Sequence, residues 1–200
     1  MLLVIDSVIV GFGRLGGWFG CERFGVRPDL VTFAKGVTSG YQPLGGVLVS
    51  GRVAEPFWSE PGRIFVRHGQ TFAGHATVCA AALANLAILE REGLIPRGQE
   101  LEGELFDALA PLRDHPLVGD VRGGTGLMAA VELAPDVLEA DADAPTKIYK
   151  AVRSSGVLLR VQASGLAISP PLIVTVEQIR ELADAVRTGL DSLRPVGAAA

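Results

Sequence analysis

Residues 30–41 read LVTFAKGVTSGY, and this stretch points to the fold of the chain. The short apolar run from Leu30 to Phe33 predicts a buried β-strand. Lys35 follows at once between Ala34 and Gly36, whose small side chains leave its amine open to a large ligand. Partial burial would lower the pKa of this lysine and favour the nucleophilic free amine. The other interpretation is a strand-end lysine whose amine reaches water.

An earlier apolar run, Leu2 to Ile5, ends at Asp6. In an open α/β sheet, ligands bind outside the carboxyl ends of the strands. A carboxylate in that place can pair with a positive group such as a protonated pyridine nitrogen. A turn or helix-cap aspartate is the alternative. Asp6 and Lys35 are therefore the first candidate site residues.

Apolar runs and helical patterns alternate along the rest of the chain, which predicts an α/β fold. We expect a mostly parallel, two-sided sheet first, and a domain boundary near residues 93–98. Further strands are expected at residues 44–50, 127–133, 157–161 and 166–168. Helices are expected at residues 73–92, 97–112, 145–154 and 176–193, the last with Thr175 as N-cap, and the tail 197–200 is expected to fray.

Composition excludes several classes of protein. The chain has 200 residues, 48% of them hydrophobic and 20% charged, so it can bury a core. The net charge is -4 and no basic stripe is visible, which argues against nucleic acid as a partner. Cys21 and Cys79 have neither metal-site nor disulfide-framework spacing, which favours a cytoplasmic protein without a metal site. No apolar run has the length of a membrane span, and the start lacks the basic region of a signal peptide.

A glycine pattern at Gly11, Gly13 and Gly16 spells G-x-G-x-x-G after an apolar run. This is the dinucleotide-binding fingerprint, which requires a helix to open at the glycines. The residues that follow include Gly20, Gly25 and others that disfavour a long helix. The fingerprint is therefore interpreted as a glycine-rich loop.

Three motifs, in order and spacing, make a specific pattern. Residues 2–50, from LLVIDSVIV to FAKGVTSGYQPLGGVLVS, resemble the core of the class III aminotransferases, which have fold type I and depend on pyridoxal 5'-phosphate (PLP). Residues 68–94, HGQTFAGHATVCAAALANLAILEREGL, resemble the segment that follows in that family. Residues 160–175, RVQASGLAISPPLIVT, resemble the C-terminal signature of its ω-amino-acid and amine transaminase branch. The resemblance covers nearly the whole chain.

The resemblance implies a role for five residues. Lys35 matches the lysine that forms the internal aldimine with PLP and then shuttles the proton, and Asp6 matches the partner of the pyridine nitrogen. Val8 matches the apolar residue on the ring face. Thr71 matches the threonine that reaches the cofactor phosphate of the neighbouring subunit, which implies a homodimer. Arg160 matches the mobile arginine that binds a substrate carboxylate, a role that suits a planar guanidinium. Without the resemblance, Thr71 would be read as a loop residue and Arg160 as a surface cation.

The sequence also departs from the family pattern. Ser7 stands where the family usually has Glu, and Ala76 stands where it usually has Pro. Ala167 occupies the position of a fixed carboxylate-binding Arg in many members directed to α-amino acids, which favours the ω branch. The family also has a long region before the Asp motif, which supplies the phosphate cradle and a ring-stacking aromatic residue, and we expect this chain to lack it.

The prediction is an aminotransferase that moves an amino group from an amine or ω-amino acid to a keto acid. Residues 1–95 are expected to be the C-terminal part of a PLP-binding large domain, and residues 96–200 a small α+β domain. A PLP-dependent aminomutase or decarboxylase of the same family is one alternative. A non-catalytic remnant, or half of a split enzyme, that acts as a dimerisation module is another. The sequence does not identify the amine.

Overall fold

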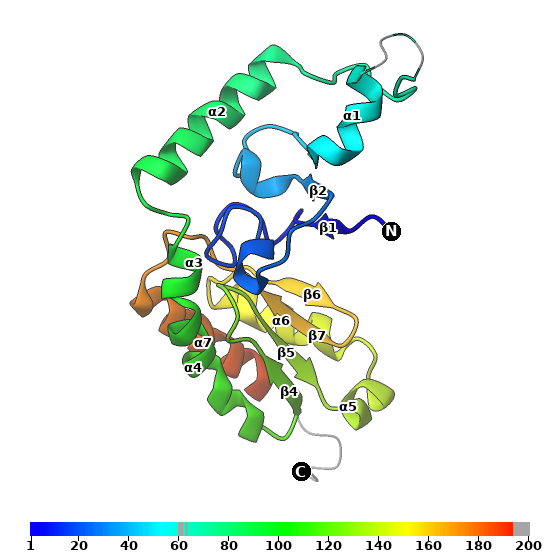
Figure 1. Ribbon diagram of the computed structural model, residues 1–200. Helices are drawn as coiled ribbons and strands as arrows, with labels where there is room; N and C mark the ends of the chain where they lie inside the picture. The colour runs from blue at the N-terminus through cyan, green and yellow to red at the C-terminus, as the bar shows by residue number, and fades with distance from the viewer. Residues whose placement is uncertain (60–61, 63, 194–200) are drawn as a thin grey trace, which may run out of the picture. The chain divides into compact units, whose positions relative to one another are not determined.

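The computed structural model describes residues 1–59, 62 and 64–193 of the chain. It contains two compact units, Met1–Arg97 and Gly98–Ala200, which are drawn in Figure 1 and described separately below. Residues 197–200, where fraying is expected, lie outside the described residues.

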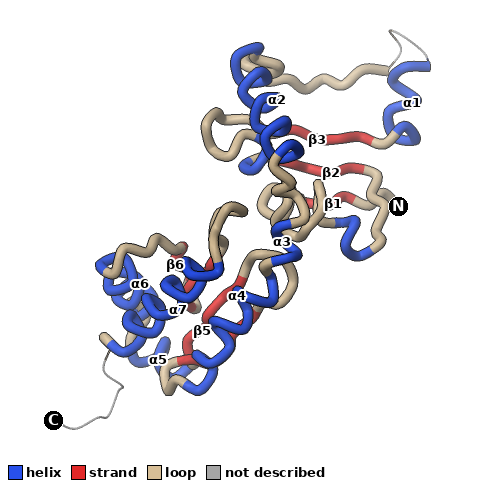
Figure 2. The backbone as a smooth tube through the Cα atoms, turned by 90° about the vertical axis from the view of Figure 1, so that its left-hand side faces the viewer, coloured by secondary structure: helices blue, strands red, loops and turns tan. Residues whose placement is uncertain are grey.

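The first unit is built on a three-stranded sheet in the order β1-β2-β3, which Figure 2 shows side by side. Its strands are β1 (Val4–Asp6), β2 (Leu30–Phe33) and β3 (Gly46–Val49). β2 has the predicted bounds, whereas β1 begins two residues later than predicted and includes Asp6. The prediction of a mostly parallel sheet holds for β1 and β2 but is wrong for β3, which is antiparallel to β2. An antiparallel neighbour needs only a turn, and the chain folds back after β2 without a crossover helix.

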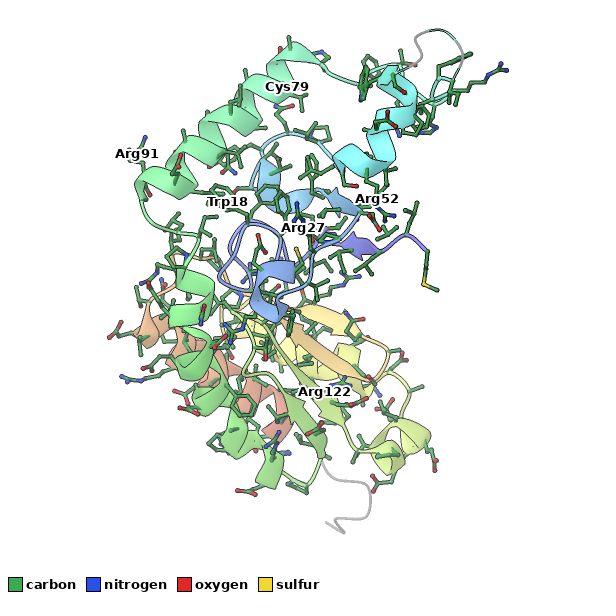
Figure 3. The ribbon with its side chains drawn as sticks, in the orientation of Figure 1. Trp18, Arg27, Arg52, Cys79, Arg91 and Arg122 are labelled. Atoms are coloured by element: carbon green, nitrogen blue, oxygen red, sulfur yellow. The ribbon has the colours of Figure 1, made fainter. Side chains whose placement is uncertain are left out.

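Asp29 fixes the start of this sheet. One carboxylate oxygen accepts the backbone N–H of Leu3 at 2.9 Å, and the other accepts from the guanidinium of Arg52. Arg52 belongs to α1 (Gly51–Ser59) and is labelled in Figure 3. One carboxylate therefore joins the segment before β1, the start of β2 and α1.

The glycine-rich loop between β1 and β2 contains turns and one 3-10 helix, η1 (Cys21–Phe24). Gly13 and Gly16 have φ of 99° and 84°, which the left-handed region allows for glycine. Among the described residues, no α-helix opens in the segment 11–25, so the structure agrees with the loop interpretation of G-x-G-x-x-G.

Two helical elements complete the first unit beside α1. η2 (Lys35–Val37) is a 3-10 turn directly after β2, and α2 (Ala76–Arg91) is the long helix expected from the alanine-rich pattern. α2 starts three residues later than predicted because residues 71–74 form a turn. The helix α1 was not predicted, since Gly51 and Pro56 are unfavourable helix residues.

The second unit is a four-stranded antiparallel sheet in the order β4-β5-β7-β6. Its strands are β4 (Val118–Arg122), β5 (Ala129–Leu133), β6 (Arg160–Gln162) and β7 (Gly165–Ile168). Its helices are α3 (Arg97–Glu100), α4 (Glu102–Leu109), η3 (Ala110–Asp114), α5 (Pro135–Ala140), α6 (Ala144–Ser154) and α7 (Val176–Asp191). The single helix predicted for residues 97–112 is wrong, because the chain breaks there into α3, α4 and η3.

A closed apolar core holds the second unit together. Val121, Val131 and Leu166 form one row across the sheet and are almost fully buried. They pack in one cluster with residues of α4, α6 and α7, such as Leu109 and Val186. The opposite side of the sheet carries the alternate residues, which are described with the site below.

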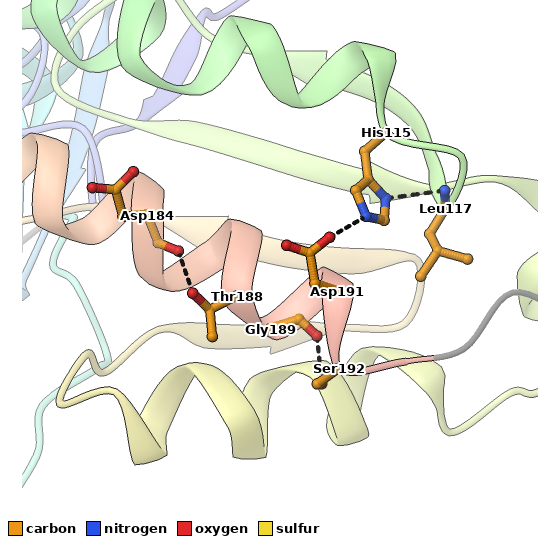
Figure 4. Close-up of polar contacts among 7 residues, drawn as sticks. All are labelled: His115, Leu117, Asp184, Thr188, Gly189, Asp191 and Ser192. Atoms are coloured by element: carbon orange, nitrogen blue, oxygen red, sulfur yellow. Dashed lines mark hydrogen bonds and ion pairs between the residues drawn. The ribbon is translucent and has the colours of Figure 1, made fainter.

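The ends of α7 are fixed by side chains. Thr175 forms a capping box with Gln178, as predicted for the N-cap. At the other end, Nε2 of His115 lies 3.2 Å from a carboxylate oxygen of Asp191 (Figure 4). The backbone N–H of Leu117 donates to Nδ1 of the same ring, so the proton of a neutral ring sits on Nε2 and is donated to Asp191. The contact joins α7 to the segment that enters β4.

Candidate active site

Asp6 closes β1 and faces Thr32 in the parallel register of β1 and β2. Its Oδ1 accepts the backbone N–H of Val8 at 3.0 Å and the hydroxyl of Thr32 at 3.1 Å. The bond from Val8 is the main cause of a lowered pKa for Asp6, followed by the bond from Thr32. Desolvation opposes these two bonds, and the positive charge of Lys35 makes the smallest contribution to the lowering. Both bonds fall on Oδ1, so among the described residues Oδ2 has no hydrogen-bond partner.

Lys35 begins η2 two residues beyond the end of β2. Because β1 and β2 are parallel, their carboxyl ends lie at the same edge of the sheet, and this places Asp6 and Lys35 at that edge. Lys35 is exposed, so the partial burial expected from the sequence is wrong. Its φ of 44° lies in the left-handed region, which is uncommon for residues other than glycine. The structure thus combines an ionised carboxylate and a strained lysine at one sheet edge.

Val8 and Ser7 follow Asp6 in the loop after β1. Val8 is half-buried. Ser7 is fully buried, and its hydroxyl donates to the carbonyl of Phe19 at 2.6 Å. Ser7 therefore fastens the glycine-rich loop to the end of β1, which accounts structurally for a small hydroxyl residue at this departure from the family pattern.

Thr71 is exposed and opens the turn before α2. Within this turn the N–H of Ala73 donates to the carbonyl of Gln70, and the N–H of His75 to that of Phe72. Thr71 therefore stands on an ordered turn at the start of a long helix. Among the described residues, no hydrogen bond joins Thr71 to Asp6 or Lys35.

Arg160 lies in the second unit and is exposed at the start of β6. Arg160 pairs with Ala167 of β7. Ala167 pairs on its other side with Ala130 of β5, and Ala130 pairs with Arg122 of β4. Residues in such a row project to the same side, so Arg160 and Arg122 end a row with two alanines between them, on the side opposite the core. Arg122 also forms an ion pair with Glu132 at 3.3 Å.

A shallow hollow of about 240 Å³ lies on this side of the sheet, and Ala130, Gly165 and Ala167 are among its lining residues. The position that the resemblance assigns to a fixed arginine in other members, Ala167, is thus directly beside Arg160 on the same side.

Two contacts of the first unit were missed in the sequence. Thr32 supports Asp6 through its hydroxyl. Asn85 of α2 donates from Nδ2 to the carbonyls of Gly36 and Val37, directly after Lys35. Asn85 is the only asparagine in the chain and interrupts a run of alanine and leucine, and this isolated amide was the available signal.

Comparison with known proteins agrees with these motifs. The family model for class-III aminotransferases matches residues 1–190. A diaminobutyrate–2-oxoglutarate transaminase of Halomonas elongata is 42% identical over 191 residues, which cover 91% of this chain and 40% of that protein. A putrescine–pyruvate aminotransferase of Pseudomonas aeruginosa is 38% identical, over 96% of this chain and 42% of that protein. The chain thus spans less than half the length of these relatives.

Solved structures give the same result. A thermostable (S)-enantioselective omega-transaminase from Thermomicrobium roseum has a TM-score of 0.88 and 41% identity, over 96% of this chain and 43% of that one. An amine transaminase from an uncultivated Pseudomonas species, solved in its PLP-bound form, has a TM-score of 0.88 and 36% identity, over 96% of this chain and 45% of that one. The α/β fold is therefore confirmed, and the chain belongs to the class III aminotransferase family.

Proposed function

We propose that this chain carries the reactive lysine of a PLP-dependent aminotransferase, and that the whole protein transfers an amino group from an amine or ω-amino acid to a keto acid. The observation that carries the proposal is the placement of Asp6 and Lys35 at the shared carboxyl end of two parallel strands. The relatives include an omega-aminotransferase and a putrescine–pyruvate aminotransferase, which supports the substrate class.

The residues at this edge fit PLP chemically. The lowered pKa of Asp6 keeps its carboxylate ionised, and the open Oδ2 can face a protonated pyridine nitrogen. When bound, PLP supplies an electron sink for bond changes at the amino-bearing carbon. Lys35 would hold the cofactor and move the proton at that carbon with its amine. Val8 would cover one face of the ring.

Residues away from this edge complete the proposal. Thr71 would reach the cofactor phosphate of a neighbouring subunit, so the proposal includes a homodimer. Arg160 would bind the carboxylate of an amino acid or keto acid, since it is exposed and its cross-strand neighbour Ala167 is small. The proposal assigns residues 1–95 to the cofactor-binding domain and residues 96–200 to the smaller domain.

The cellular location proposed from cysteine usage is cytoplasmic. Among the described helices, none is long and apolar enough to cross a membrane.

Borohydride labelling tests the role of Lys35. The chain contains three lysines, and Lys147 and Lys150 on α6 serve as internal controls. In the whole protein, incubation with PLP and reduction should fix the cofactor mainly on Lys35, as read by peptide mapping. Lys35→Ala should remove this label and abolish transamination, because one amine serves both the link and the proton transfer. Equal labelling of all three lysines would contradict the proposal.

A further inference from the structure

The backbone of Lys35 is held in a conformation that lysine does not favour. Its φ is 44°, and later in the same segment Ser39 has a φ of 48°. Left-handed backbone at residues other than glycine persists only where the surroundings determine it, and such positions gather at functional sites. The contacts of the turn after β2 therefore identify what holds Lys35 in place.

Two sides of this turn are supported from within the first unit by packing and by a buried hydroxyl. A Cβ on Gly36 would lie 2.9 Å from Cβ of Phe12, so the backbone of the turn lies directly on this buried phenylalanine. Thr38 is almost fully buried and donates from Oγ1 to the carbonyl of Gln42 at 2.6 Å. These contacts hold the turn at Gly36 and at Thr38.

The remaining support comes from α2, more than forty residues along the chain. Nδ2 of Asn85 donates to the carbonyl of Gly36 at 2.9 Å and to the carbonyl of Val37 at 3.1 Å. Asn85 is half-buried, and its Nδ2 donates to the carbonyls of the two residues that follow Lys35. A side chain on a long helix thus clamps the backbone next to the lysine.

We propose that Asn85 is a positioning residue for Lys35, and that its amide holds the turn so that the lysine amine is presented at the edge of the sheet beside Asp6. The inference rests on the proposed role of Lys35. Asn85 does not contact the cofactor or the substrate in this scheme. It acts through the two carbonyls, because moving either peptide group would rotate the backbone that directs the lysine side chain.

The test uses the labelling ratio between lysines in the whole protein. PLP is the aldehyde, borohydride the reductant, and the label on Lys35 is divided by the label on Lys147 and Lys150. Asn85→Ala should lower this ratio about 3- to 10-fold, the scale of losing one or two modest hydrogen bonds. Asn85→Asp, which has the same size but turns acceptors toward the two carbonyls, should lower it at least as much. Asn85→Gln keeps the amide and should restore part of the ratio.

The matched control is Leu89→Ala on the same helix. Leu89 is buried and its side chain has no hydrogen-bonding group, so its truncation should lower the unfolding free energy but leave the labelling ratio unchanged. All variants are compared at a temperature where circular dichroism shows them folded, and Asn85→Asp carries the test if Asn85→Ala does not fold.

The outcomes separate this inference from the proposed function. A wild-type chain that shows no preference for Lys35 would remove the role of Lys35 and this inference with it. A wild-type preference that survives in both Asn85→Ala and Asn85→Asp would overturn the role of Asn85 alone. An equal loss in Leu89→Ala would also overturn it, since any loosening of α2 would then have the same effect.

Discussion

Asp6 combines an open carboxylate oxygen with two donors on the other oxygen. Replacing it by Asn keeps the shape and the acceptor for Val8 and Thr32, but removes the negative charge that would stabilise a protonated pyridine. We expect Asp6→Asn to lower the transamination rate roughly 100-fold, the scale of losing a key electrostatic partner. Steady-state rates of the whole protein with saturating PLP measure this effect. An unchanged rate would make Asp6 a turn residue.

The pH dependence of stability gives a second measurement on Asp6. Its folded-state pKa lies below the ordinary value because the charged form is hydrogen-bonded. Such a group stabilises the fold at pH values above the ordinary aspartate pKa, near 3.9, and the contribution is lost as the pH falls through the lower folded-state value. The difference in urea midpoint between wild type and Asp6→Asn should therefore be present at neutral pH and shrink below about pH 4. A constant difference would show that the charge contributes nothing.

Arg160 is exposed and has small neighbours across the strands, so its guanidinium has room to meet a ligand. Arg160→Ala should raise KM for keto acids by a factor that corresponds to about 1.5 to 3 kcal/mol, the range of a charge-assisted hydrogen bond. Simple amines carry no carboxylate, so their KM should stay unchanged. Arg122→Ala, at the other end of the same row, is the matched control. Equal damage to amines and keto acids would indicate a structural role for Arg160.

Two helices of the second unit pack against each other at a glycine. α6 and α7 cross closely at Gly189, where an added Cβ would lie 2.5 Å from Cγ2 of Val152 and 3.0 Å from the carbonyl oxygen of Ile148. Gly189→Ala should therefore lower the unfolding free energy by about 1 to 3 kcal/mol through overpacking. Chemical denaturation of the second unit measures the change.

Gly103 offers the matched substitution. It lies in α4, and an added Cβ would meet nothing within 4 Å. Gly103→Ala should leave the stability unchanged or raise it by up to about 1 kcal/mol, because alanine is the better helix former. Only Gly189→Ala is expected to be destabilising, and an equally destabilised Gly103→Ala would mean that the close crossing at Gly189 is not the cause.

The two units differ at the scale of the whole molecule. The largest fully buried side chains of the described residues all belong to the second unit. Exposed large apolar side chains of the described residues are concentrated in the first unit, where Val47, Leu48 and Val49 of β3 are about half exposed, whereas the second unit has only Leu158 and Ile173. The second unit therefore has a fully buried apolar core, whereas the first unit exposes apolar side chains of β3.

Apolar surface of this kind promotes association. We expect the purified 200-residue chain to self-associate, and the double variant Val47→Lys and Val49→Lys to associate less, as measured by sedimentation velocity. Leu158→Lys changes an exposed apolar residue of the second unit and should leave association unchanged. A wild-type chain that sediments as a monomer at all concentrations would contradict the prediction.

Much of this architecture could be predicted from local sequence. The bounds of β2 follow from an apolar run. The Thr175 cap of α7 follows from a hydroxyl residue three positions before the amide side chain of Gln178. Lys35 and Asp6 could be named because each ends an apolar run. By contrast, β4 (VGDVR) was missed because its charged residues hide the alternation, and only pairing with β5 makes it a strand.

By itself, the sequence determined the family, the α/β class and the candidate residues Asp6, Val8, Lys35, Thr71 and Arg160, because motifs and apolar periodicity are local properties of the chain. Only the tertiary structure decided which of these groups meet. The parallel pairing of β1 with β2 brings Asp6 to the edge that carries Lys35. The bonds from Asn85 hold the turn after that lysine across more than forty residues. Strand pairing and side-chain bonds between distant segments depend on the packed chain, and no local pattern encodes them.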